Sequence, residues 1–209
     1  MNYLFIDASE NSTFAQTGNN NGFIAKTFDT NRNFAAKITT ICDQMLAEAG
    51  ISKSQLDLLS VCTGPGSLTG LRVAAGFMRT MAWLLEKPLT GVNLFEWSLQ
   101  TLLANGHEGP LRLVMPTLID KAFEVYATLP DLTHSQPILI ERSAIVSQTP
   151  TFGIRFIADK IQKVQPEPAA LHKILLSANT KACDFNDILE ILPMYVIPSQ
   201  AERKFKETK

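Results

Sequence analysis

Residues 58–86 read Leu58-Leu59-Ser60-Val61-Cys62-Thr63, then Gly64-Pro65-Gly66-Ser67-Leu68-Thr69-Gly70-Leu71-Arg72, then Val73-Ala74-Ala75-Gly76-Phe77-Met78-Arg79-Thr80-Met81-Ala82-Trp83-Leu84-Leu85-Glu86. The apolar run before Gly64 predicts a buried strand, and the glycines and proline after it predict a tight turn. We expect a helix from Val73 to Glu86, with Ser67 and Thr69 as candidate caps. A strand, a glycine turn and a helix N-terminus together present backbone N–H groups that can bind an anion.

The glycine turn, residues 64–72, differs from both standard nucleotide-binding motifs. In a Walker A loop four residues separate the first glycine from Gly-Lys-Ser/Thr, whereas here Gly70 comes one residue later and Leu71-Arg72 follows it. The dinucleotide fingerprint is one residue shorter and belongs to the first strand–helix unit. A tight strand-to-helix connection and a phosphate site remain alternative interpretations. The candidate residues of that site are Asp7, Ser9, Gly64, Gly66, Ser67 and Thr69.

The rest of the chain alternates short strands and helices around this stretch. Before it, the pattern predicts strands at 3–6, 13–17 and 23–28 and a helix at 33–49 that stops at Gly50. After it, we expect a strand at 88–92 and a helix at 94–103. Beyond residues 105–110, a glycine- and proline-containing boundary, we expect strands at 111–118, 122–129, 137–140 and 153–157 and helical segments at 168–178 and 188–192.

Composition limits the classes of function. The 209 residues are 45% hydrophobic and 19% charged with a formal net charge of −1, without the basic surplus of nucleic-acid-binding proteins. Three widely spaced cysteines favour reduced thiols over a disulfide framework or a zinc site. Because Asp7 interrupts the N-terminal apolar run, we expect no signal peptide. No apolar run reaches the ~20 residues of a membrane span, so the expected location is the cytoplasm.

Several motifs together resemble one bacterial family. They are Asp7-Ala8-Ser9, Gly64-Pro65-Gly66-Ser67-Leu68-Thr69-Gly70-Leu71-Arg72-Val73, Asp120-Lys121-Ala122-Phe123-Glu124-Val125-Tyr126, Pro193-Met194-Tyr195 and Ser199-Gln200-Ala201-Glu202. On these motifs the chain resembles the TsaB (YeaZ) proteins of bacterial tRNA threonylcarbamoyladenosine biosynthesis, once classed with glycoproteases. The resemblance covers nearly the whole chain, and the glycine block is its long and specific part.

The resemblance implies an α/β fold of the actin-like, ribonuclease H-like class, with two related lobes and mixed sheets flanked by helices. The boundary near residue 106 places the lobes at 1–106 and 107–209. The resemblance also implies a non-catalytic scaffold or activator, without a cofactor, that pairs with the related catalytic subunit TsaD and works with the ATPase TsaE. In that complex threonylcarbamoyl is placed on the adenosine beside the tRNA anticodon. The implied subunit forms a homodimer when alone and meets tRNA only through the complex.

The chain departs from the family pattern at several positions. Ala8 stands where the family often has threonine, Asn33 where it has histidine, and Lys121 where it has arginine. Val196-Ile197 follows Pro193-Met194-Tyr195, where a basic residue is usual. These departures put ligand contacts in doubt and leave the expected architecture unchanged.

The residues themselves favour a protein without catalysis or a metal. His107, His134 and His172 are far apart and do not form the i, i+4 pair that a metal-binding relative would carry. Only Gly153 of the 11 glycines lies beyond Pro110, so the second half lacks a glycine-rich phosphate clamp. Asp7 at the end of a strand has two interpretations, a magnesium ligand or a cap of the following turn.

The helix after the glycine turn has a wider apolar face than one sheet requires. At ~100° per residue its apolar side chains span an arc of ~180°, whereas a helix on one sheet needs roughly 100°. Packing between the sheet and a second helix, and a protein–protein interface shared with the helix at 33–49, both explain the excess; the resemblance implies the interface. The candidate interface residues are Phe34, Ile38, Ile41, Met45, Leu71, Arg72, Val73, Phe77, Met78, Arg79, Met81 and Leu84.

Two other functions remain open from the sequence. One is an active small-molecule kinase or acyltransferase of the actin-like class, against which the glycine-poor second half counts. The other is a glycoprotease, against which the absence of a histidine pair counts.

Overall fold

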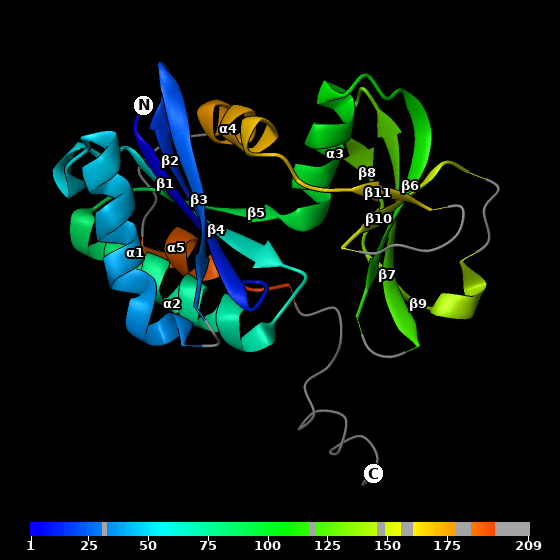
Figure 1. Ribbon diagram of the computed structural model, residues 1–209, viewed down its shortest axis with the longest axis horizontal. Helices are drawn as coiled ribbons and strands as arrows, with labels where there is room; N and C mark the ends of the chain where they lie inside the picture. The colour runs from blue at the N-terminus through cyan, green and yellow to red at the C-terminus, as the bar shows by residue number, and fades with distance from the viewer. Residues whose placement is uncertain (31–32, 118–119, 146–148, 156–160, 179–184, 195–209) are drawn as a thin grey trace, which may run out of the picture.

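The computed structural model describes residues 1–30, 33–117, 120–145, 149–155, 161–178 and 185–194. Within these ranges the chain forms two β-sheets with helices between and beside them (Figure 1). From one side to the other, the layers are α1 with α2, the first sheet, α3 with α4, and the second sheet (Figure 1). The predicted class of mixed sheets flanked by helices is therefore observed.

The first sheet has five strands in the order β3-β2-β1-β4-β5. β1, β2 and β3 form an antiparallel meander, whereas β4 and β5 run parallel to β1. Because β1 and β4 are parallel neighbours, the turns that follow them meet at the same edge of the sheet. The strands are β1 Tyr3–Asp7, β2 Ser12–Asn19, β3 Gly22–Asp29, β4 Leu58–Gly64 and β5 Leu89–Asn93.

The second sheet follows the path β11-β10-β6-β7-β8, and β9 also pairs with β7. β6 and β7 form the antiparallel hairpin predicted from the sequence, and β10 and β11 add to β6 in parallel. The short strands β8 and β11 were not predicted. The strands are β6 Gly109–Pro116, β7 Lys121–Leu129, β8 Thr133–His134, β9 Ile138–Glu141, β10 Thr151–Ile154 and β11 Gln162–Val164.

The helices are α1 Phe34–Ala49, α2 Leu68–Leu85, α3 Leu94–Ala104, α4 Pro168–Ser177 and α5 Phe185–Glu190, with short 3-10 turns at Lys53–Gln55 and Arg142–Ala144. α1 ends at Gly50 in the left-handed conformation, as predicted. The predicted start of α2 at Val73 was wrong. The helix begins five residues earlier because Ser67 is its N-cap, accepting a hydrogen bond from the Gly70 N–H at 3.4 Å.

The hydrophobic core has two parts, which share the first sheet. One part packs α1 and α2 against one face, through residues such as Ile41 and Met78. The other part fills the space between the two sheets around α3, where Phe95 and Leu99 are buried. α3 contacts strands of both sheets and buries most of its surface, so it is the element that joins them.

The division into lobes at residue 106 stays a prediction. Sequence order and spatial order differ after it, since α4 packs against α3 and β2, and α5 packs against α2. Within the described residues, the longest and most apolar helices fall short of what crossing a membrane requires. Cys183, Tyr195, Val196, Ile197 and residues 199–202 lie outside the described residues.

Candidate functional site

The first part of the candidate site is the turn that follows β1. Asp7 and Ser9 are buried, and the Asp7 carboxylate accepts a hydrogen bond from the Ser9 backbone N–H at 2.8 Å. This is the turn-capping contact that the sequence offered as one interpretation of Asp7. The carboxylate therefore has a structural partner within its own turn.

The glycine turn lies directly against this first turn. The Ser67 N–H donates to the Ser9 carbonyl oxygen at 2.8 Å. A Cβ at Gly66 would lie 2.5 Å from the same oxygen, and a Cβ at Gly70 would lie 2.0 Å from the Ala8 carbonyl oxygen. These glycines allow two backbone segments to touch, so their packing role is established by the geometry. The exposed residues at this end of α2 are Gly66, Ser67 and Thr69.

Arg155 reaches this position from the second sheet and was missed by the sequence analysis. It follows β10, and its guanidinium Nη2 lies 2.8 Å from Ser9 Oγ and 3.5 Å from Asp7 Oδ2. Its Nε forms an ion pair with Glu10 Oε1 at 2.5 Å. A signal was present, because Arg155 is a single charge in the apolar run Gly153-Ile154-Arg155-Phe156-Ile157. Without a known partner, that charge had no assignable role.

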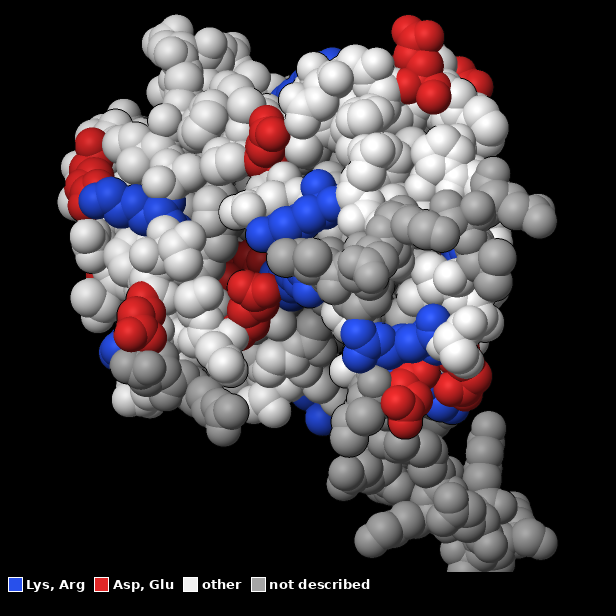
Figure 2. Space-filling model, turned by 45° about the vertical axis from the view of Figure 1, so that its right-hand side comes forward, with Lys and Arg blue, Asp and Glu red and all other residues white. Residues whose placement is uncertain are grey.

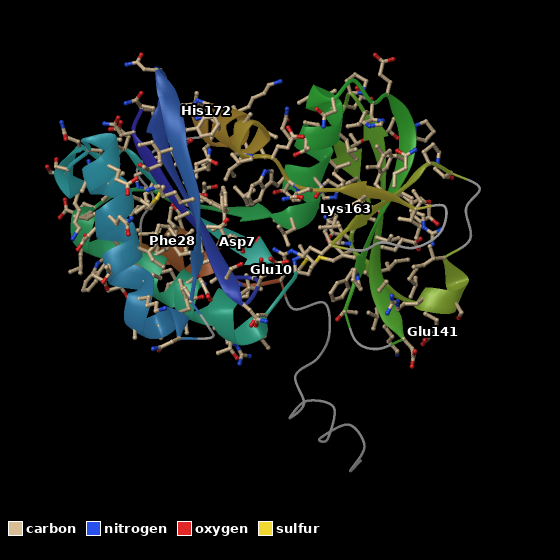
Figure 3. The ribbon with its side chains drawn as sticks, viewed as in Figure 1. Asp7, Glu10, Phe28, Glu141, Lys163 and His172 are labelled. Carbon is tan, nitrogen blue, oxygen red and sulfur yellow. The ribbon has the colours of Figure 1, made fainter. Side chains whose placement is uncertain are left out.

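A cleft of about 390 Å³ opens between the two sheets beside these residues. Its floor is apolar, formed by Phe14, Leu94 and Trp97, and its rim is charged, formed by Asp7, Glu10, Arg155 and Lys163. Figure 3 shows Asp7 and Glu10 on the first sheet and Lys163 on the side of the second, with the cleft between them. Charged side chains of both signs gather near the middle of the face in Figure 2.

Neither described cysteine is suited to nucleophilic chemistry. Burial raises the pKa of the Cys62 thiol well above its ordinary value, and the nearby Asp7 carboxylate adds to this shift. Burial also raises the pKa of Cys42 to about 12. Both thiols are therefore neutral at physiological pH. Within the described part of the chain, His, Cys, Asp and Glu side chains form no group of three that could hold a metal ion.

The candidate interface residues fall into a buried and an accessible group. Phe34, Ile38, Ile41, Met45, Leu71 and Met78 are buried in the core and are not available at the surface. Val73, Phe77 and Met81 are half-buried, Arg72 is exposed, and Leu84 is 69% exposed. Arg79 is half-buried and donates to the Ile191 carbonyl oxygen after α5. That these helices form an interface stays a prediction, and the sequence could not separate their inward from their outward sides.

The accessible part of α2 borders a groove against α1, which we call the α1–α2 groove. It has a volume of about 230 Å³ and is lined by Thr39, Cys42, Asp43, Lys53, Phe77, Thr80, Met81, Leu84 and Leu85. Asp43 and Lys53 form an ion pair at its edge, 2.6 Å apart. Next to it, Trp83 is 58% exposed. The two most exposed large apolar side chains of α2 are thus consecutive in sequence, and exposed apolar residues of this size are typical of an interaction surface.

Comparison with known proteins finds similar sequences and similar structures. A family model described as TsaD, tRNA N6-adenosine threonylcarbamoyltransferase, matches residues 19–118. The tRNA threonylcarbamoyladenosine biosynthesis protein TsaB of Bacillus subtilis is 30% identical over 98 residues, which are 47% of this chain and 41% of that protein. The aligned segment therefore spans less than half of this curated relative.

Two solved structures match nearly the full length. A protein with similarity to peptidase YeaZ from Pseudomonas aeruginosa superposes with a TM-score of 0.73 at 15% identity, covering 94% of this chain and 99% of that one. YeaZ from Pseudomonas aeruginosa gives a TM-score of 0.73 at 16% identity, covering 93% and 99%.

The chain is similar to the TsaB (YeaZ) proteins, in sequence over about half of its length and in fold over nearly all of it. The resemblance inferred from the motifs is confirmed, and the fold is that of the solved YeaZ structures. The TsaD model match begins in β2 and ends after β6, so it includes α1, α2 and the glycine turn.

The departures from the TsaB pattern lie at different places in this structure. Ala8 is buried beside Gly70, and Asn33 is the exposed residue immediately before α1. Lys121 begins β7 and pairs with Glu141 of the neighbouring strand at 3.5 Å.

Proposed function

We propose that this chain is a non-catalytic subunit in the formation of N6-threonylcarbamoyladenosine beside the tRNA anticodon. It pairs with a catalytic subunit of the TsaD type and works with the ATPase TsaE, and it self-associates when alone. The reaction pathway in this proposal, threonylcarbamoyladenosine formation, is the one named for the similar TsaB protein and for the TsaD family model. In this proposal tRNA is contacted only through the complex, since the net charge of −1 offers no basic surplus for direct binding.

The observation that carries the non-catalytic role is Arg155 on Asp7. The guanidinium contacts Asp7 and Ser9 at the end of β1, where a ligand of the glycine turn would otherwise approach. The two turns also contact each other directly through Ser67 and Ser9. The candidate phosphate site formed by Asp7, Ser9 and the turn glycines is thus occupied by the protein's own groups, and we regard it as vestigial.

The proposed pairing surface is the α1–α2 groove with Trp83 and Leu84. Large apolar side chains that are exposed on one helix lose accessible surface when a partner covers them, and such residues dominate the affinity of protein interfaces. Leu84 is the best position for a test because it is 69% exposed. Phe77 and Met81 are packed against the core, so a charge there would also affect folding.

The test is co-expression with the TsaD-type and TsaE-type proteins of the same organism, followed by co-purification and an assay of tRNA modification. We expect the chain to elute with the catalytic subunit, and we expect modification only when it is present. Leu84→Glu should weaken the pairing by about 30-fold or more, because a carboxylate would be buried without a partner. Ile138→Glu is the matched control, since Ile138 is 49% exposed on β9, far from α2 in the layer order. Its pairing should be unchanged.

A small-molecule enzyme of the actin-like class is the second candidate, and the cleft of about 390 Å³ favours it. The isolated chain is then expected to turn over a substrate, for example by hydrolysing ATP. Turnover by the purified chain, or failure to pair with the catalytic subunit at micromolar concentration, would refute the accessory role.

A further inference from the structure

Arg155 connects the two sheets at the mouth of the cleft. It follows β10 of the second sheet, and its described partners are Asp7, at the end of β1 in the first sheet, and Ser9 and Glu10 in the turn after it. One guanidinium contacts three side chains because its N–H groups point in several fixed directions. Loss of Arg155 would therefore remove every one of these links at once.

The backbone of Arg155 supports a specific role for this residue. Its φ is +57°, in the left-handed region that residues with a Cβ rarely adopt. Such conformations persist where the surrounding contacts determine them. For Arg155 the contacts are those of its side chain with the first sheet, so the conformation and the link between the sheets support each other.

The link lies over an apolar floor. Trp97 of α3 is 4% exposed, and its ring packs against Phe14 at 5.3 Å between centroids. Both residues line the same cleft as Arg155 and Lys163. If the two sheets separated on this side, these aromatic side chains would be the first apolar surface to meet water.

We propose that Arg155 is a latch that keeps the cleft narrow by tying the second sheet to the β1 turn. Arg155 contacts the buried carboxylate of Asp7 in the interior and the half-exposed carboxylate of Glu10 at the surface. Without Arg155 the two sheets move apart on the cleft side while α3 continues to join them. The proposal concerns the isolated chain and does not depend on the α1–α2 groove or on the proposed function.

The chain contains two tryptophans, so the latch can be tested by fluorescence. Trp83→Phe leaves Trp97 as the only tryptophan. Acrylamide quenches tryptophan fluorescence on contact, and because it is neutral, its approach is not altered when the charge of residue 155 is removed. The quenching constant of Trp97 then measures how accessible the cleft floor is. In this background Arg155→Met should raise the quenching constant at least about two-fold, because the open population increases. Arg155→Lys should give a smaller increase, because an ammonium group cannot reproduce the guanidinium geometry.

Lys163→Met is the matched control, since it removes a cation that lines the same cleft but has no described contact with the β1 turn. Its quenching constant should equal that of the background. Far-UV circular dichroism checks that each variant is folded. If Arg155→Met does not fold, Glu10→Gln tests the latch instead, because it removes only the ion pair between Arg155 and the half-exposed Glu10. An increase in quenching with Glu10→Gln supports the latch, and unchanged quenching in every folded variant overturns it.

Discussion

Gly70 allows the turns after β1 and β4 to touch because it has no side chain. Its Cα lies so close to the first turn that a Cβ would be 2.0 Å from the Ala8 carbonyl oxygen, and the obstacle is backbone, which cannot move aside as a flexible side chain does. Gly76, two turns later on the same helix, has open space where its Cβ would be. The two glycines therefore differ in role although the sequence presents them alike.

We expect Gly70→Ala to lower the free energy of unfolding by about 2–4 kcal/mol, since the turns after β1 and β4 must separate to admit the methyl group. Gly76→Ala should raise it by about 0.5–1 kcal/mol, because alanine is the better helix former and meets no obstacle. Urea denaturation of the two variants measures both effects. Equal effects of the two substitutions would show that helix propensity alone matters and that the close approach to Ala8 does not.

At the scale of elements, long periodic segments were predictable and short paired ones were not. α1 and the β6–β7 hairpin follow from spacing and turn chemistry, as in Ile38, Ile41 and Met45 of α1. β8 has two residues and β11 has three, too few to show a period, and both exist because a neighbouring strand pairs with them. Arg155 was unpredictable for the same reason, since its partners lie about 145 residues away in sequence.

A polar network contributes to the docking of α4 on the first sheet, beside the buried apolar side chains of this helix. Gln16 Nε2 donates to the Tyr3 hydroxyl at 2.8 Å, and that hydroxyl lies 2.7 Å from His172 Nδ1. We assign the tyrosine as the donor and a neutral His172 as the acceptor, because Gln16 already donates to the hydroxyl oxygen. The Phe23 ring packs against the imidazole. Burial raises the pKa of Tyr3 to about 12 and lowers the pKa of His172. Both shifts favour the neutral forms that this network requires.

Stability should consequently fall in mild acid. The folded pKa of His172 lies below its ordinary value of 6.5, so the unfolded chain binds a proton first as the pH falls. The contribution of the neutral histidine is complete above pH 6.5 and is lost as the pH falls from there towards the folded pKa. His172→Gln keeps an acceptor for Tyr3 but does not titrate. The unfolding midpoint of the natural chain should drop more between pH 7.5 and 5.5 than that of the variant; equal drops would exclude His172 as the cause.

For the whole molecule, α3 makes the two sheets parts of one core. Phe5 and Leu58 of the first sheet, and Leu113 and Val125 of the second, are buried in the same cluster around this helix. α4 and α5 then return from the second half of the chain to pack on the first. A boundary at residue 106 would mark the start of a second sheet, but α3, which precedes this boundary, contacts strands of both sheets.

We therefore expect the sheets to unfold together. Leu113→Ala, in the fully buried middle of β6, should lower the free energy of unfolding by about 2–5 kcal/mol. Hydrogen exchange followed by mass spectrometry should show faster exchange of the protected amides in β1 and β4 by the same factor as in β6, because one opening reaction exposes all of them. Leu46→Ala, on the buried side of α1 in the other part of the core, is the reciprocal variant and should also accelerate exchange in both sheets. Faster exchange confined to the sheet that carries the substitution would show two independent folding units and contradict this prediction.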